Sequence, residues 1–142
     1  MNNTIFAIRG KANIGKTSTI KYIYEFLKEK YPNSVIEKVI LSTDIKIVIT
    51  INNILIGIES QGDPNSRLAE SLDDFIKNNC NIIICGARTR GMTNDWIKKY
   101  STQFEIKWIK KVISDDKTNE DKDNRNQAAQ IVKKIELLLN EV

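Results

Sequence analysis

The sequence contains no histidine, and its 142 residues include only two cysteines and two prolines. Without histidine, every Ser-His or Cys-His hydrolase mechanism is excluded, and a zinc site of the usual Cys/His type is not expected. With two prolines and six glycines the chain is not collagen-like or linker-like. No apolar run approaches the roughly 20 residues of a membrane-spanning helix, so no membrane partner is expected.

The charge balance is only mildly basic. The formal net charge is +4, and 28% of the residues are charged against 41% hydrophobic. These are ordinary values for a globular protein, and the length predicts a single domain over residues 1–142. So small an excess of positive charge does not indicate nucleic-acid binding, but it suits an anionic small ligand such as a nucleotide.

The two cysteines flank an apolar run of four residues. Cys80 and Cys85 lie five positions apart, so in a strand their side chains point to opposite faces, and a bridge between them is not expected. This cysteine usage indicates a reducing, cytoplasmic compartment.

Apolar patterning predicts strands alternating with helices. The expected strands are 4–8, 35–41, 45–51, 54–58, 82–85 and 104–113, and the expected helices are 17–30, 66–77, 93–100 and 127–140. Asn52 and Asn53 tolerate positive φ and predict a tight antiparallel hairpin. Five acids and three bases fill residues 114–126, which are expected to form a mobile surface loop. The alternation indicates an α/β protein with a largely parallel sheet plus that hairpin.

Two glycines bracket the motif Gly10-Lys11-Ala12-Asn13-Ile14-Gly15-Lys16-Thr17, which fits the pattern G-x-x-x-x-G-K-[ST] in full. It directly follows an expected strand and opens an expected helix. In such a loop the backbone N–H groups curl around phosphates, and the positive end of the helix dipole faces the same anion. The lysine neutralises phosphate charge, and the hydroxyl reaches Mg²⁺. The alternative is a glycine-containing turn that binds nothing.

This segment resembles the Walker A motif of the P-loop NTPase superfamily. The resemblance implies a three-layer P-loop NTPase fold, with a mostly parallel sheet and one antiparallel hairpin. It also implies Mg²⁺-dependent binding of a nucleoside triphosphate, ATP rather than GTP because nothing resembles N-K-x-D. The implied nucleotide contacts are Gly10, Lys11, Ala12, Asn13, Ile14, Gly15, Lys16, Thr17 and Ser18.

A carboxylate at the end of a neighbouring strand usually completes the Mg²⁺ site of such enzymes. Glu59 ends an apolar run, and Glu59-Ser60-Gln61-Gly62 resembles the D-x-x-G switch of TRAFAC GTPases with Glu in place of Asp. By the same resemblance, Gln61 is a candidate to orient the attacking water. Asp63 is an equal candidate for the acid, so the expected metal ligands are Thr17, Glu59 and Asp63. The alternative is that both acids belong to a capped turn.

A third candidate segment follows the apolar run 82–85. Arg88 or Arg90 could bind a substrate phosphate or stabilise transferred charge, because ligands gather at the carboxyl ends of parallel strands. The segment loosely resembles the D-G-F-P-R-T turn of nucleoside monophosphate kinases, with Cys85 where the acid would stand. An ordinary surface loop is the alternative. Asp44 is a further candidate, at the end of the expected strand 35–41.

Three functions remain open. The first is a small kinase or NTPase, with Lys16, Glu59, Asp63 and Arg88 as catalytic residues and an acceptor that the sequence does not define. The second is a regulatory switch that acts through a protein partner or through dimerisation. In support of a homodimer, Lys11 resembles the signature lysine of the partitioning and septum-site ATPases, which have a deviant Walker A loop. The third is a nucleotide-binding module without catalysis.

Overall fold

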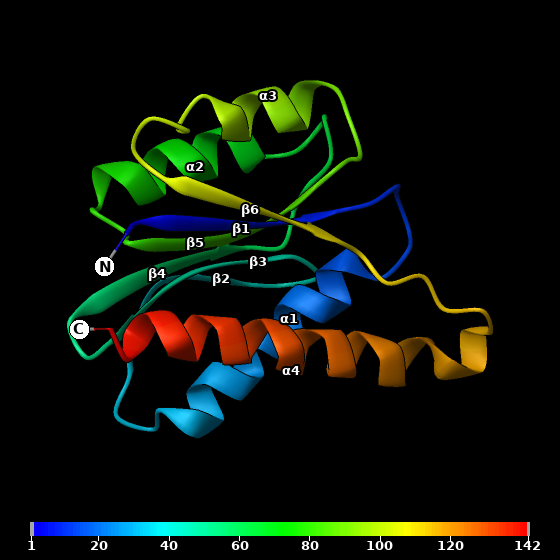
Figure 1. Ribbon diagram of the computed structural model, residues 1–142, viewed down its shortest axis with the longest axis horizontal. Helices are drawn as coiled ribbons and strands as arrows, with labels where there is room; N and C mark the ends of the chain where they lie inside the picture. Colours follow the sequence, from blue (N-terminus) through cyan, green and yellow to red (C-terminus); the bar gives the residue numbers. More distant parts are fainter. Residues whose placement is uncertain (1, 142) are drawn as a thin grey trace.

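Helices cover both faces of a single sheet (Figure 1). The computed structural model describes residues 2–141. Its strands are β1 (Thr4–Arg9), β2 (Val35–Leu41), β3 (Ile45–Ile51), β4 (Ile54–Glu59), β5 (Ile82–Ala87) and β6 (Glu105–Lys110). Its helices are α1 (Lys16–Lys30), α2 (Leu68–Lys77), α3 (Met92–Lys98) and α4 (Glu120–Leu139), with a short 3₁₀ turn η1 (Lys117–Asn119). Helices α1 and α4 lie together on one face, and α2 and α3 lie on the other.

The sheet is mixed, with strand order β2-β3-β4-β5-β1-β6. The expectation of a mostly parallel sheet of the P-loop NTPase type is therefore wrong, although the α/β class is confirmed. Strands β4, β5, β1 and β6 run parallel to one another, but β3 is antiparallel to both β2 and β4. The reason lies in the link between β2 and β3, residues 42–44. A parallel crossover needs a dozen or more residues, so a link this short can only join antiparallel neighbours.

The expected hairpin between β3 and β4 is confirmed. Asn52 and Asn53 have φ values of 51° and 68°, so both central residues of the turn are left-handed. Two successive positive φ angles match the twist of the flanking strands, and asparagine adopts them with less strain than most residues.

The core is formed by aliphatic side chains on both faces of the sheet. On one face α1 contributes Ile20, Ile23 and Leu27, all fully buried. On the other face α2 approaches β4 closely at Gly57, where a Cβ atom would lie 2.5 Å from Cγ of Phe75. This close packing fixes the ends of β1, β4 and β5, from which the site is built.

The acidic segment 114–126 is not a loop throughout. Its second half is helical, because α4 begins at Glu120 rather than near residue 127. Glu120, Asp121 and Asp123 lie in the first turn of α4, where negative charge is stabilised by the helix dipole. The charge run that predicted a loop is thus the solvated start of a helix, and it brings Glu120 to the site.

Residues 2–141 contain neither a bond between the two cysteines nor a helix that could span a membrane. Cys80 and Cys85 are buried and are not joined to each other, as their spacing predicted. No helix in this range has the length and apolar character needed to span a membrane.

Candidate phosphate-binding site

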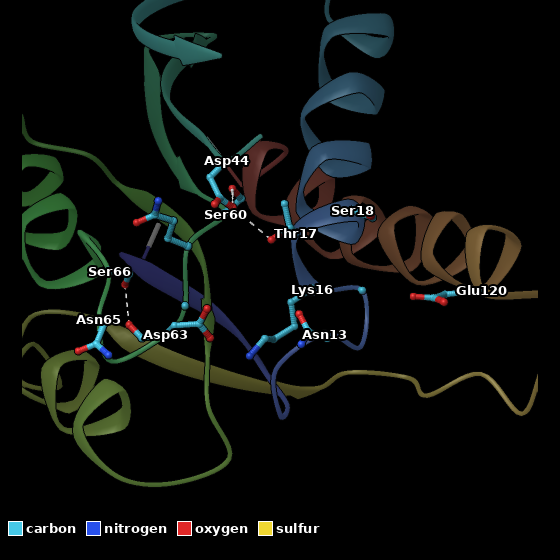
Figure 2. Close-up of a pocket in the computed structure, with 13 residues that line it drawn as sticks. Asn13, Lys16, Thr17, Ser18, Asp44, Ser60, Asp63, Asn65, Ser66 and Glu120 are labelled. Atoms are coloured by element: carbon cyan, nitrogen blue, oxygen red, sulfur yellow. Dashed lines mark hydrogen bonds between the residues drawn. The ribbon is translucent and has the colours of Figure 1, made fainter. Parts of the chain in front are cut away.

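A cavity of about 480 Å³ lies where β1 runs into α1 and where β4 runs into α2 (Figure 2). This is the edge at which the parallel strands end, the usual ligand position in such sheets. The lining residues come from the β1–α1 loop, the link before β3, the β4–α2 turn and α4: Asn13, Gly15, Lys16, Thr17, Ser18, Asp44, Ser60, Gln61, Gly62, Asp63, Asn65, Ser66 and Glu120.

The β1–α1 loop ends in a left-handed residue that begins α1. Gly15 is the N-cap with a φ of 96°, and no side chain caps the helix there. The first N–H groups of a helix have no partner within the helix, so they are available to an anion. A Cβ atom on Gly15 would also lie 2.7 Å from both amide atoms of Asn124. Glycine is therefore required here by its conformation and by the space.

The first half of the loop folds back on itself. A Cβ atom on Gly10 would lie 2.4 Å from Cδ1 of Ile14, so the Ile14 side chain packs directly over Gly10 and would have to shift for a larger residue. Asn13 has a φ of 61° and its side chain lines the cavity. Lys11 is exposed, and neither Lys11 nor Ala12 lines the cavity.

Lys16 is a cation that is almost entirely enclosed. Lys16 is only 7% exposed. Its Nζ donates hydrogen bonds to the carbonyl oxygens of Gly10 at 2.6 Å and Ala87 at 3.1 Å. Burial lowers the pKa of Lys16, an effect that Asp63 opposes and Arg88 reinforces. An ammonium group held in this way at the cavity wall gains from an anionic partner.

Three oxygen-bearing side chains meet beside Lys16. The Oδ1 atom of Asp44 accepts hydrogen bonds from Thr17 Oγ1 at 3.2 Å and from Ser60 Oγ at 2.9 Å. Ser60 Oγ in turn accepts from the backbone N–H of Ile45 at 2.8 Å, which fixes the hydroxyl. Carboxylate and hydroxyl oxygens are the ligands that Mg²⁺ prefers. Asp44 thus lies where an acid was expected, while Ser60 was predicted only as part of the switch-like segment.

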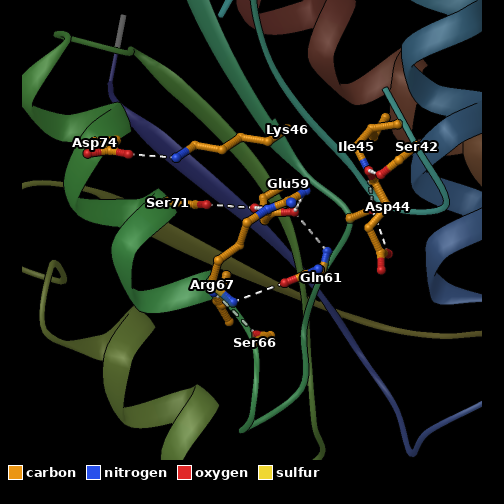
Figure 3. Close-up of polar contacts among 12 residues, drawn as sticks. Ser42, Asp44, Ile45, Lys46, Glu59, Gln61, Ser66, Arg67, Ser71 and Asp74 are labelled. Carbon is orange, nitrogen blue, oxygen red and sulfur yellow. Dashed lines mark hydrogen bonds and ion pairs between the residues drawn. The ribbon is translucent and has the colours of Figure 1, made fainter. Parts of the chain in front are cut away.

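Glu59 does not line the cavity. It is fully buried, and its carboxylate is bound by Arg67 through Nε at 2.7 Å and Nη2 at 3.2 Å, and by Ser71 Oγ at 2.6 Å (Figure 3). Its Oε2 also accepts from the backbone N–H of Gln61 at 3.0 Å. Glu59 therefore anchors the start of the β4–α2 turn. The Gln61 side chain is engaged too, because its Oε1 accepts from the N–H of Arg67 at 2.9 Å.

Asp63 and Arg88 form an ion pair at the edge of the cavity. Arg88 Nε lies 2.8 Å from Asp63 Oδ1, and the two side chains are 35% and 53% exposed. Asp63 lines the cavity, whereas Arg88 reaches it only through this pair. The turn lies directly on β5, since a Cβ atom on Gly62 would lie 2.3 Å from the carbonyl carbon of Gly86. Arg90 is exposed and does not line the cavity.

Six of the twelve predicted site residues line the cavity: Asn13, Gly15, Lys16, Thr17, Ser18 and Asp63. Lys16, Thr17, Ser18 and Asp63 share one cavity, and Asp44 joins them. Glu59 does not line the cavity, so Thr17, Glu59 and Asp63 do not come together there. Among residues 2–141, no group of three or more His, Cys, Asp or Glu side chains is placed to hold a metal ion. Ser60 was predicted only as part of the switch-like segment, and the sequence did not indicate Asn65, Ser66 or Glu120 as lining residues. Of these residues, only Glu120 could have been found from the sequence, because it belongs to the run of acids that begins α4.

Comparisons with family models, with curated proteins and with solved structures gave no match to this chain. The function must therefore be argued from the site itself.

Proposed function

We propose that the loop 10–17 binds the triphosphate of a nucleotide together with Mg²⁺, with ATP preferred to GTP. One observation carries this proposal: the enclosed ammonium of Lys16 lies beside the uncapped N-terminus of α1. A fixed positive charge next to free backbone N–H groups is a site for an anion bearing several charges. The cavity of about 480 Å³ is within the range of small-ligand pockets.

The donors around Asp44 fit Mg²⁺. Thr17, Ser60 and Asp44 would hold the ion through two hydroxyl oxygens and a carboxylate. When bound, Mg²⁺ would neutralise phosphate charge and polarise the bond to be broken. In this proposal Asp44 takes the role for which Glu59 was considered, because Glu59 is occupied by Arg67 and Ser71.

The reaction that suits these residues is hydrolysis or phosphoryl transfer. Such reactions need positioning and charge neutralisation more than covalent chemistry from the protein. Lys16 orients the phosphates, and the carboxylate of Asp63 lines the same cavity with one oxygen on Arg88. Asp63 can orient a water molecule or an acceptor hydroxyl. If its ion pair with Asp63 breaks, Arg88 can stabilise the negative charge on the transferred phosphoryl group.

A switch that acts on a partner protein is the second candidate. It is favoured by the position of the β4–α2 turn, whose residues 60–63 line the cavity while Glu59 and Arg67 anchor its ends. A nucleotide phosphate in the cavity would contact this turn and could change its arrangement.

Calorimetric titration with ATP and GTP, with and without Mg²⁺, tests the proposal. The wild-type chain should bind ATP more tightly than GTP, and Lys16→Ala should abolish binding. Lys21→Ala removes the same charge from the same helix outside the cavity and should bind as wild type does. Tight ATP binding by Lys16→Ala, or no heat with either nucleotide, would refute the assignment.

Turnover separates the functions once binding is established. Phosphate release from ATP alone, with a change in oligomeric state on a non-hydrolysable analogue, favours the switch. Transfer to a nucleoside monophosphate or a small alcohol favours the kinase, and binding without turnover leaves a nucleotide-binding module.

A further inference from the structure

One end of the cavity carries an acid that the proposed phosphate contacts leave unused. Glu120, the first residue of α4, lines the cavity with Asn13 and Ser18, and its side chain points from α4 toward the loop (Figure 2). Within residues 2–141 the carboxylate of Glu120 has no hydrogen-bond or ion-pair partner. Glu120 also attracts the ammonium group of Lys111 without forming an ion pair with it. A half-buried acid that faces a cavity and makes no hydrogen bond within the described chain is placed to accept hydrogen bonds from a ligand.

The charged side chains around the cavity determine the orientation in which a nucleotide would bind. Lys16 lies between Glu120 on one side and the β4–α2 turn on the other (Figure 2). A phosphate next to Glu120 would be repelled, because Glu120 has no ion-pair partner among the described residues, whereas Asp63 is paired with Arg88 and Asp44 is proposed to hold Mg²⁺. The phosphate tail is therefore expected over Lys16 and toward Asp44 and Asp63. The nucleoside then lies on the side of Ser18 and Glu120.

The neighbouring turn of α4 holds a second acceptor, which lies behind Gly15 and not on the cavity wall. Asn124 follows Glu120 by four residues, so both lie on one side of the helix. It is 3% exposed and packs against Gly15, and its Oδ1 has no hydrogen-bond partner within the described chain. The carboxylate of Glu120, which does line the cavity, only accepts hydrogen bonds, so it suits hydroxyl or amine donors and does not suit phosphate oxygens, which are themselves acceptors.

The sugar of a nucleotide is the nearest source of such donors. It is bonded directly to the phosphate closest to the nucleoside, so it lies next to a loop that holds the phosphates, while the base lies further out. We propose, on the basis of the proposed function, that Glu120 accepts hydrogen bonds from the sugar hydroxyls and that the chain selects ribonucleotides over deoxyribonucleotides.

Four ligands and two variants test this inference by calorimetry. The ligands are Mg²⁺ complexes of tripolyphosphate, ATP and the 2′- and 3′-deoxy forms of ATP; the variants are Glu120→Gln and, as a matched control, Asp123→Asn. A hydrogen bond to a charged group predicts that wild type binds ATP about tenfold more tightly than at least one deoxy analogue. Glu120→Gln keeps a neutral acceptor in place of the charged one, so it should reduce that difference, and it should bind tripolyphosphate as tightly as wild type or more tightly. Asp123→Asn, which removes a charge from the same helical turn outside the cavity, should keep the difference.

The sign of the change distinguishes the outcomes. If Glu120 only repels the ligand, Glu120→Gln binds ATP more tightly, and the inference fails. The inference also fails if wild type binds ATP and both deoxy analogues equally. It fails too if Glu120→Gln weakens the binding of ATP and both deoxy analogues by the same factor, which would mean that the acid contacts the base. If wild type binds tripolyphosphate without distinguishing the sugars, only this inference is lost. If it binds neither tripolyphosphate nor ATP, the proposed function fails with it.

Discussion

Lys16 combines two properties at the scale of a single residue: it is charged, and it is enclosed by the carbonyl oxygens of Gly10 and Ala87. Burial therefore lowers its pKa below the ordinary 10.5. Between the lowered pKa and 10.5 the unfolded chain binds more protons than the folded one, so the free energy of unfolding should rise with pH across this window.

The same shift predicts how nucleotide binding depends on pH. A triphosphate stabilises the ammonium form, so affinity for Mg²⁺-ATP should fall as pH rises through the lowered pKa, and binding in that range should take up a proton. Titrations over alkaline pH in two buffers of different ionisation enthalpy measure both effects. Lys16→Arg stays charged and should show neither. An affinity that rises with pH, or a proton uptake that Lys16→Arg shares, would contradict the assignment.

Asp44 is the acid that the structure places beside Thr17, and Asp44→Asn tests it. The amide oxygen can still accept from Thr17 and Ser60, so the local structure should persist, but the negative charge that attracts Mg²⁺ is lost. We expect the gain in ATP affinity from Mg²⁺ to fall by about tenfold, while binding without Mg²⁺ is unchanged or stronger. Glu37→Gln, on the strand that precedes Asp44, is the control. An unchanged Mg²⁺ dependence in Asp44→Asn would exclude the proposed ligand.

At the scale of elements, the turn from β4 into α2 depends on Glu59. Removing one partner of a buried ion pair leaves the other uncompensated, so Glu59→Ala should lower the free energy of unfolding by about 3 kcal/mol. Denaturant unfolding measures this, with exposed Glu37→Ala as the control. Unchanged stability together with lost Mg²⁺ dependence would instead make Glu59 the metal ligand.

Some of these elements could be predicted from the sequence and others could not. The motif 10–17 predicted a strand, a tight loop and a helix, and each is present because glycine spacing and apolar periodicity are local signals. The partner of Glu59 was not predictable, because only the path of the β4–α2 turn brings Arg67, eight residues later, onto the carboxylate. The acids of 114–126 were misread, since a polar run describes a solvated helix start as well as a loop.

At the scale of the whole molecule, the sheet is where the sequence was most misleading. Alternating strands and helices suggested parallel order, and the reversed orientation of β3 follows instead from the short links on both of its sides. This arrangement carries Asp44 to the carboxyl ends of β1 and β4, so residues from distant parts of the chain share one cavity. Strand order decides which side chains meet, and a single sequence does not encode that order locally.

The central claim is that backbone amides at the start of α1 hold the phosphates, and chemical-shift mapping of the ¹⁵N-labelled protein tests it most directly. Titration with Mg²⁺-ATP should move the amide signals of residues 13–18 first and most strongly, with smaller changes at 60–63, and Mg²⁺-tripolyphosphate should reproduce the changes at 13–18. Perturbations confined to another surface, or none at these residues at saturating ligand, would contradict the account.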